Sequence, residues 1–214
     1  SLKFQLTQAQ VRALAEIMKD LDSARPMCRM LQGDVGSGKT VLAAAALLAA
    51  SSSGYQAIMM APTEILAEQH FQTMGNLLQG NRQAVLTDEY IKSFSDWKGS
   101  TSNGLTISML TGGMSKREKE KVYTKAKEGE LDIIVGTHAL IQEGLSFKNL
   151  GLAVIDEQHR FGVEQRSSLR QKGFNPHLLV MTATPIPRTL ALTFFGDLDL
   201  SILDQMPPGR KPVK

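Results

Sequence analysis

The sequence contains the stretch Gly33-Asp34-Val35-Gly36-Ser37-Gly38-Lys39-Thr40 between an apolar run and an alanine-rich segment of high helix propensity. The stretch matches the G-x-x-x-x-G-K-[ST] pattern, a loop that turns its backbone N–H groups around phosphates at the start of a helix. In this pattern the lysine reaches the β- and γ-phosphates and the Thr40 hydroxyl is a ligand of Mg²⁺. An ordinary glycine-rich turn is the alternative, and the expected strand, loop and helix order argues against it.

Apolar runs alternate with helical patterns along the rest of the chain, which is typical of a parallel sheet covered by helices. Strands are expected at residues 27–31, 56–60, 105–110, 131–135, 152–155 and 178–181. Helices are expected at residues 7–19, 39–50, 64–78, 115–127 and 187–194. Thr7 is the expected N-cap of the first helix, and Ser115 begins a capping-box pattern with Glu118. The pattern predicts an α/β fold.

The composition is that of an ordinary globular protein, with 42% hydrophobic and 21% charged residues in 214. A net charge of +3 is too small to indicate a nucleic-acid partner by itself. Cys28 is the single cysteine, which excludes an internal disulfide and suits a cytoplasmic location. The longest apolar stretch, residues 41–50, is too short to span a bilayer, so no membrane partner is expected.

Two segments depart from this alternation. Residues 81–104 are polar and include Trp97, and they are expected to form a surface insertion, because a loop of this length is uncommon in a compact domain. Residues 205–214 contain three prolines and are expected to be a linker. One domain is therefore expected over residues 1–204.

A second set of candidate site residues follows the apolar run at 152–155. Asp156 lies at the expected strand end, where it can hold Mg²⁺ through water, and Glu157 can polarise the attacking water as a general base. The alternative is that the two acids cap a following helix. A GTPase would carry an Asn-Lys-x-Asp guanine reader, which the sequence lacks. The two motifs together favour an ATP-driven motor.

The residues around Asp156 resemble those of a known family. Asp156-Glu157-Gln158-His159 resembles the Asp-Glu-x-His box of superfamily 2 helicases, and with Arg160-Phe161-Gly162 and the loop at 33–40 the chain resembles the RecG family of branched-DNA translocases. Further matches occur in the family's order: Phe4 and Gln10 (Q motif), 61–67 (Ia), 110–112 (Ib), 136–140 (Ic), 182–189 (III) and 207–212, the segment leading to a second motor lobe. The resemblance implies a three-layer RecA-like P-loop NTPase domain with a mostly parallel central sheet.

The resemblance also implies a role for each matching residue. Lys39, Asp156, Glu157 and His159 would serve ATP hydrolysis, with His159 coupling it to DNA, while Gln10 would bond the adenine edge beside Phe4. The implied contacts to DNA phosphates come from Pro62, Thr63, Thr111, Gly112, Thr137 and His138. The implied residues that link the ATP state to DNA are Thr182, Thr184 and Arg188. Alternatives are core packing for Phe4, helix caps or turns for the three DNA-side threonines, and a surface charge for Arg188.

The family implies an ATP-dependent DNA helicase that remodels forks and Holliday junctions in recombination and repair, with ATP and Mg²⁺ as cofactors. It also implies an N-terminal wedge domain and a second RecA-like lobe in cis. The chain by itself is expected to bind nucleotide weakly and hydrolyse it poorly, because the arginine finger of the second lobe is worth about 10³ to 10⁵ in rate.

Two other functions stay open at this stage. The motor of a transcription-repair coupling factor shares the Asp-Glu-x-His-Arg-Phe-Gly pattern, but we expect glutamate rather than Gln158 there. A non-catalytic module could use ATP only as a structural ligand, and Glu157 argues against this second alternative.

Overall fold

The computed structural model describes residues 5–79, 84–95, 104–142, 144–156, 175–184 and 198–207. Within these residues the strands are β1 (Cys28–Gly33), β2 (Gln56–Met60), β3 (Ala84–Asp88), β4 (Ile91–Ser95), β5 (Gly104–Leu110), β6 (Ile133–Gly136), β7 (Leu150–Asp156), β8 (His177–Thr182) and β9 (Asp199–Leu203). The helices are α1 (Gln8–Leu21), α2 (Lys39–Ser52), α3 (Glu64–Gln79), α4 (Lys116–Glu128) and the 3₁₀ helix η1 (His138–Ile141). Helices and strands alternate along most of the chain, as the sequence predicts.

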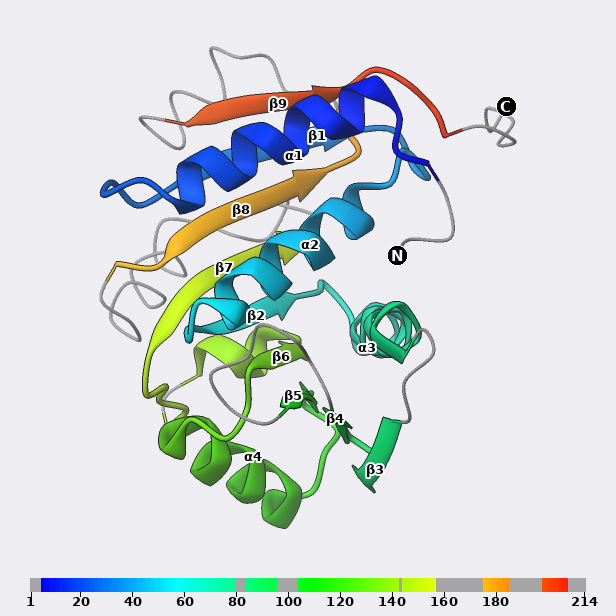
Figure 1. Ribbon diagram of the computed structural model, residues 1–214. Coiled ribbons are helices and arrows are strands. Elements are labelled where there is room, and N and C mark those ends of the chain that lie inside the picture. The colour runs from blue at the N-terminus through cyan, green and yellow to red at the C-terminus, as the bar shows by residue number, and fades with distance from the viewer. Residues whose placement is uncertain are drawn as a thin grey trace.

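The strands of the described residues form one nine-stranded sheet in the order β3-β4-β5-β6-β2-β7-β8-β1-β9 (Figure 1). Every neighbouring pair from β5 to β9 is parallel, whereas the pairs β3–β4 and β4–β5 are antiparallel. The central strands β2 and β6 are buried along their whole length, as expected for strands covered on both faces. The prediction of a mostly parallel α/β sheet is confirmed.

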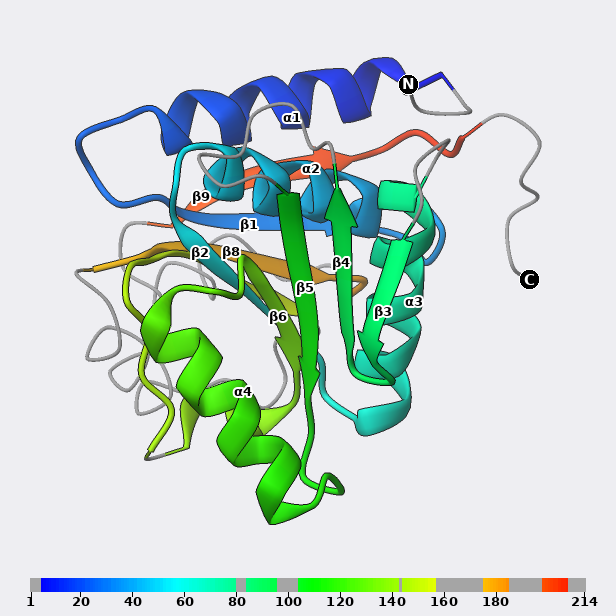
Figure 2. The same cartoon turned by 60° about the horizontal axis from the view of Figure 1, so that its bottom comes forward.

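Helices cover both faces of the sheet and produce three layers. One apolar core joins α1, α2 and α3 to the sheet, and a second joins α4 and η1 to its opposite face. Successive residues of β2 alternate between them, with Ala57 and Met59 in the first core and Ile58 and Met60 in the second. Figure 2 shows α4 beside β5 and β6, well away from α1. This is the expected RecA-like layering.

Residues 84–95, inside the expected surface insertion, form the hairpin strands β3 and β4 rather than a loop. They extend the sheet at its edge, and β4 pairs with β5. Ile91 and Phe94 are each only 1% exposed, so this polar segment contributes to the core. Lys92 lies over the ring of Phe71, 4.6 Å from its centre, and covers the apolar surface there. The sequence analysis missed these strands because their few apolar residues lie within a segment that is polar as a whole.

Both predicted N-caps are confirmed. The Thr7 side chain accepts from the Gln10 N–H, and the Gln10 side chain accepts from the Thr7 N–H, which completes a capping box at the start of α1. Ser115 and Glu118 form the same reciprocal pair at the start of α4. These bonds fix where both helices begin.

The sequence analysis did not predict β9, which pairs in parallel with β1. The guanidinium of Arg29 in β1 is buried at this side of the sheet. Arg29 Nη1 donates to Ser201 Oγ of β9 at 2.9 Å, and Arg29 Nε donates to Asp20 Oδ2 of α1 at 2.7 Å. A single buried cation therefore joins α1, β1 and β9.

Some predictions fall on residues outside those described. These are the helix at 187–194, Trp97, most of the linker at 205–214, and the site residues Phe4, Glu157, His159 and Arg188. In the described ranges, no helix has both the length and the apolar character that crossing a membrane requires.

Candidate nucleotide-binding site

The predicted phosphate loop and the predicted magnesium ligand lie on the same edge of the sheet. Strand β8 lies between β1 and β7, and all three are parallel, so their carboxyl ends meet. Gln32 pairs with Thr182, and Met181 pairs with Asp156. The end of β1 and the end of β7 are therefore two strands apart, roughly 10 Å. Ligands of parallel α/β sheets bind at this edge.

The loop from Gly33 to Thr40 has the backbone that phosphate binding requires. Gly36 and Gly38 have φ angles of 85° and 90°, in the left-handed region that side chains disfavour. A Cβ atom on Gly38 would also lie 2.3 Å from Gln10 Nε2. Gly38 is the N-cap of α2 and provides no side-chain cap, so the start of this helix presents its positive end to a ligand.

The Lys39 ammonium lies over its own loop. Its Nζ donates to the carbonyl oxygens of Gly33 at 2.5 Å and Asp34 at 2.9 Å. A phosphate oxygen is a stronger acceptor for an ammonium than a carbonyl oxygen. Ser37 Oγ is one of two buried side-chain oxygens in the described residues without a hydrogen-bond partner. The loop thus has donors suited to a phosphate.

Thr40 and Asp156 fit a magnesium ion by their chemistry. Mg²⁺ prefers hard oxygen ligands and keeps several of its waters. A threonine hydroxyl on one strand-loop-helix unit and a carboxylate two strands away supply such oxygens. Glu157 and His159, the other predicted catalytic residues, lie outside the described residues.

Gln10 links the first helix to the phosphate loop. It is 2% exposed, and its Nε2 donates to the Ser37 carbonyl oxygen at 2.7 Å. Its Oε1 accepts from the Thr7 N–H at 2.8 Å. The residue predicted to recognise adenine therefore also supports the loop, and its contact with adenine stays a prediction.

His70 is a site residue that the sequence analysis missed. Its Nε2 lies 2.6 Å from Asp156 Oδ2, and the two side chains are 10% and 15% exposed. A helical pattern could have identified it, because His70 lies on the buried face of α3. The buried apolar side chains of this face are Ala67, Phe71, Met74 and Leu78. A polar side chain on the buried apolar face of a helix needs a hydrogen-bond partner inside the protein.

Thr182 and Thr184 lie at the end of β8, between the phosphate loop and Asp156. The Thr184 N–H donates to Thr182 Oγ1 at 3.2 Å, and the two hydroxyl oxygens are 3.0 Å apart. These bonds fold the strand end into a tight turn. This location is suited to the coupling role implied by the resemblance, which stays a prediction.

The residues predicted to contact DNA follow the neighbouring strands β2, β5 and β6. Gly136 pairs with both Met60 and Leu110, so these strand ends continue the same edge. A Cβ atom on Gly136 would lie 2.1 Å from the Leu110 carbonyl oxygen, which explains the need for glycine. The structure thus brings the two predicted groups of residues to adjacent parts of one edge.

The DNA-side residues differ in exposure. Thr63, Gly112 and His138 are exposed and Pro62 is half-buried, whereas Thr111 and Thr137 are 6% and 8% exposed. Thr63 Oγ1 accepts from the Leu66 N–H at 3.3 Å and caps α3. The helix-cap alternative thus holds for Thr63, and it leaves a phosphate contact as a further prediction.

Backbone groups at these loops already have partners inside the protein. The Thr137 N–H donates to the Leu110 carbonyl at 3.2 Å, and the Gly113 N–H donates to Glu64 Oε1 at 2.8 Å. Lys119 Nζ donates to the Gly112 carbonyl at 2.6 Å. The sequence analysis did not identify Glu64 or Lys119 as supports of this loop.

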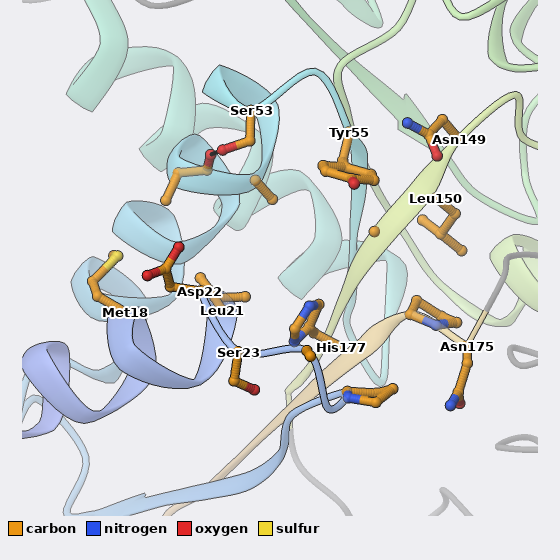
Figure 3. A pocket seen from close by; sticks show the side chains of 16 residues that line it. Met18, Leu21, Asp22, Ser23, Ser53, Tyr55, Asn149, Leu150, Asn175 and His177 are labelled. Carbon is orange, nitrogen blue, oxygen red and sulfur yellow. Dashed lines mark hydrogen bonds between the residues drawn. The ribbon is translucent and has the colours of Figure 1, made fainter.

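The structure also has a pocket of about 700 Å³ at the opposite, amino edge of the sheet (Figure 3). Met18 and Asp22 line it at the end of α1, and Tyr55, Asn149 and His177 surround its other side (Figure 3). None of the site residues predicted from the sequence lines this pocket.

Comparisons with known proteins agree with the fold and the motifs. The DEAD/DEAH box helicase family matches residues 7–193. The chain is 53% identical over 213 residues to the ATP-dependent DNA helicase RecG of Streptococcus pneumoniae, covering 100% of this chain and 28% of that protein. It is 49% identical to RecG of Bacillus subtilis, again over 28% of the relative. The chain therefore spans about a quarter of the length of these relatives.

Solved structures give the same result. A structure of RecG bound to a three-way DNA junction matches 99% of this chain and 25% of its own, with 42% identity and a TM-score of 0.74. The helicase domain of Hef from Pyrococcus furiosus has a TM-score of 0.60 at 20% identity, which shows a shared fold alone. With a family match over most of its length and the motifs at one sheet edge, the chain belongs to the DEAD/DEAH box helicase family.

Proposed function

We propose that this chain is the ATP-binding motor domain of an ATP-dependent DNA helicase that remodels branched DNA. The observation that carries the proposal is the 53% identity to a RecG helicase over the whole chain. A neighbour of 42% identity is bound to a three-way DNA junction, which favours forks and junctions as the substrate class. A role in DNA repair and recombination, and a cytoplasmic location, are part of this proposal.

In the proposed reaction, Lys39 and the amides of residues 33–40 bind the phosphates of ATP. Thr40 and Asp156 hold Mg²⁺, which would neutralise the charge that develops on the phosphates. Glu157 polarises the attacking water as the general base. Gln10 and Phe4 contact the adenine. The proposed coupling residues between ATP and DNA are His159, Thr182, Thr184 and Arg188.

The DNA-side part of the proposal uses the loops after β2, β5 and β6. Exposed Thr63, Gly112 and His138, together with Pro62, contact phosphates without reading bases. Thr111 and Thr137 are buried, so in this proposal they contact DNA phosphates only after their loops open. The proposal places the domain at residues 1–204 with a linker at 205–214. A wedge domain and a second RecA-like lobe belong to the same protein.

The test uses the full-length protein with Glu157→Gln. We expect ATP binding within a few-fold of the unmodified protein and ATP hydrolysis slower by about 10² to 10⁴, the usual contribution of a general base. Glu68→Gln removes the same charge from an exposed position of α3 and should hydrolyse ATP normally. Equal turnover in the two variants would exclude the catalytic role of Glu157 and favour a module that uses ATP only as a ligand.

The substrate class is tested by ATP hydrolysis of the unmodified full-length protein with either a three-way junction or a linear duplex of equal length. We expect stronger stimulation by the junction. Equal stimulation by both DNAs would exclude branched DNA as the preferred substrate. A protein made of residues 1–214 alone should hydrolyse ATP about 10³ to 10⁵ times more slowly than the full-length protein, because the proposed second lobe would supply the arginine finger.

A further inference from the structure

The contact between His70 and Asp156 joins α3 to the candidate magnesium ligand. The Nε2–Oδ2 distance is 2.6 Å, and the residues are 86 positions apart in the sequence. A carboxylate that holds Mg²⁺ is ionised and only accepts hydrogen bonds, so in that state the His70 Nε2–H is the donor. The bond holds one carboxylate oxygen and thereby sets the direction of the other.

The position of His70 is fixed by the packing of its helix. Ala67 is fully buried and Phe71 is 1% exposed, and both belong to the core between α3 and the sheet. At the start of α3, Thr63 caps the helix and Glu64 accepts from the Gly113 N–H. A helix held at its start and along its buried face keeps the imidazole in place before any ligand binds.

We propose that His70 is a positioning residue that orients Asp156 for Mg²⁺. This inference rests on the proposed function, because it assumes that Asp156 holds the ion of Mg-ATP. Partners of metal-binding carboxylates and histidines fix ligand orientation, and their loss costs about 10- to 100-fold in metal affinity or activity. His70 contacts neither the nucleotide nor the ion in this proposal, and it acts through the Asp156 carboxylate.

Three substitutions separate hydrogen bonding from packing. His70→Gln keeps a donor at about the reach of Nε2, whereas His70→Asn keeps polarity but its amide is too short to reach Asp156. His70→Leu removes the donor and keeps an apolar body. Gln69→Ala, at the exposed neighbouring position, is the matched control.

The measurement is the binding of a fluorescent ATP analogue to the full-length protein, titrated with Mg²⁺ and repeated without it. We expect His70→Asn and His70→Leu to need about 10- to 100-fold more Mg²⁺ for half-maximal tight binding, with unchanged affinity in metal-free buffer. His70→Gln and Gln69→Ala should stay close to the unmodified protein. Rescue by glutamine is the result that a purely structural role would not produce.

If His70→Asn needed the same Mg²⁺ concentration for half-maximal tight binding as the unmodified protein, the proposal would be overturned, even if His70→Leu failed to fold. An equal loss in His70→Gln and His70→Asn would overturn it as well, because it would indicate packing of the ring. Binding by the unmodified protein without any dependence on Mg²⁺ would overturn it too, because Asp156 would then hold no ion. No binding of the analogue by the unmodified protein at any Mg²⁺ concentration would contradict the proposed function instead, so the two failures are distinguishable.

Discussion

The carboxyl and amino edges of the sheet differ in the ends of the helices that they present. At the carboxyl edge, α2 and α3 begin directly after the loops that follow β1 and β2. At the amino edge, α1 ends at Leu21 and α2 ends at Ser52, beside the pocket of Figure 3. Helix starts carry partial positive charge and helix ends carry partial negative charge. The two edges therefore favour ligands of opposite charge.

The volume of a pocket is therefore not sufficient to identify it as the candidate nucleotide site. The pocket of about 700 Å³ is lined by Ala49, Ala50 and Ser53 at the end of α2 and by Asp22 after α1. Its helix ends and its carboxylate disfavour a triphosphate. The phosphate loop instead presents N–H groups, an ammonium and a helix start.

The largest effect is expected at the carboxyl edge, from Lys39→Ala in the full-length protein. We expect ATP hydrolysis to fall by about 10² to 10³, the usual cost of removing one preorganised donor to a reacting oxyanion. Asn149→Ala alters the amino-edge pocket and should leave hydrolysis unchanged. Steady-state ATPase rates test both variants. A larger loss of ATPase rate in Asn149→Ala than in Lys39→Ala would indicate that the nucleotide binds in the amino-edge pocket.

A smaller effect, on stability, is expected from Gln56→Leu at the amino edge. Gln56 Nε2 donates to the carbonyls of Ala126 and Leu131, and its Oε1 accepts from the N–H groups of Lys148 and Asn149, at 2.8–3.1 Å. Leucine would leave buried backbone groups unpaired, at about 1–3 kcal/mol for such a group. We expect the midpoint of thermal unfolding to fall by roughly 2–12 °C.

Nucleotide affinity at temperatures where Gln56→Leu stays folded should match the unmodified protein, because its partners lie at the amino edge. Thermal unfolding followed by circular dichroism and a binding titration of the same sample test this separation. A loss of nucleotide affinity without a loss of stability would show that the two edges are not independent.

The smallest effect concerns the acid stability of the amino edge. Burial lowers the pKa of His177 below its ordinary value of 6.5, and its Nδ1 accepts from the Met27 N–H at 3.0 Å. The unfolded chain therefore binds a proton more readily than the folded one, and this contribution to stability is lost as pH falls through the folded pKa. We expect His177→Asn, which keeps an acceptor near Nδ1, to reduce the decline in unfolding free energy between about pH 7 and pH 5.

Urea unfolding at several pH values measures this slope. A steeper decline in His177→Asn than in the unmodified protein would contradict the assignment. Asn149→Ala, in the same pocket and without a titratable group, is the matched control and should keep the unmodified slope.

Some parts of the fold can be predicted from local sequence, because interactions between residues close in the chain fix them. The strand, glycine loop and helix around residues 28–52 follow from backbone conformations that only this glycine spacing allows. The starts of α1 and α4 follow from capping boxes within four residues of sequence. The buried parallel strands follow from continuous apolar runs, since a strand covered on both faces has no polar side.

Contacts between residues far apart in the chain could not be predicted in this way, because they depend on how the helices pack on the sheet. The position of β4 in the core depends on Phe71 and β5, and β9 depends on Arg29 of β1. The pairing of His70 with Asp156 depends on how α3 packs over the sheet. Local pattern can mark one member of such a pair, as the helical pattern marks His70, but it does not identify the partner, because the energy of the pair comes from burial and hydrogen bonds that exist only after the sheet and its helices have assembled.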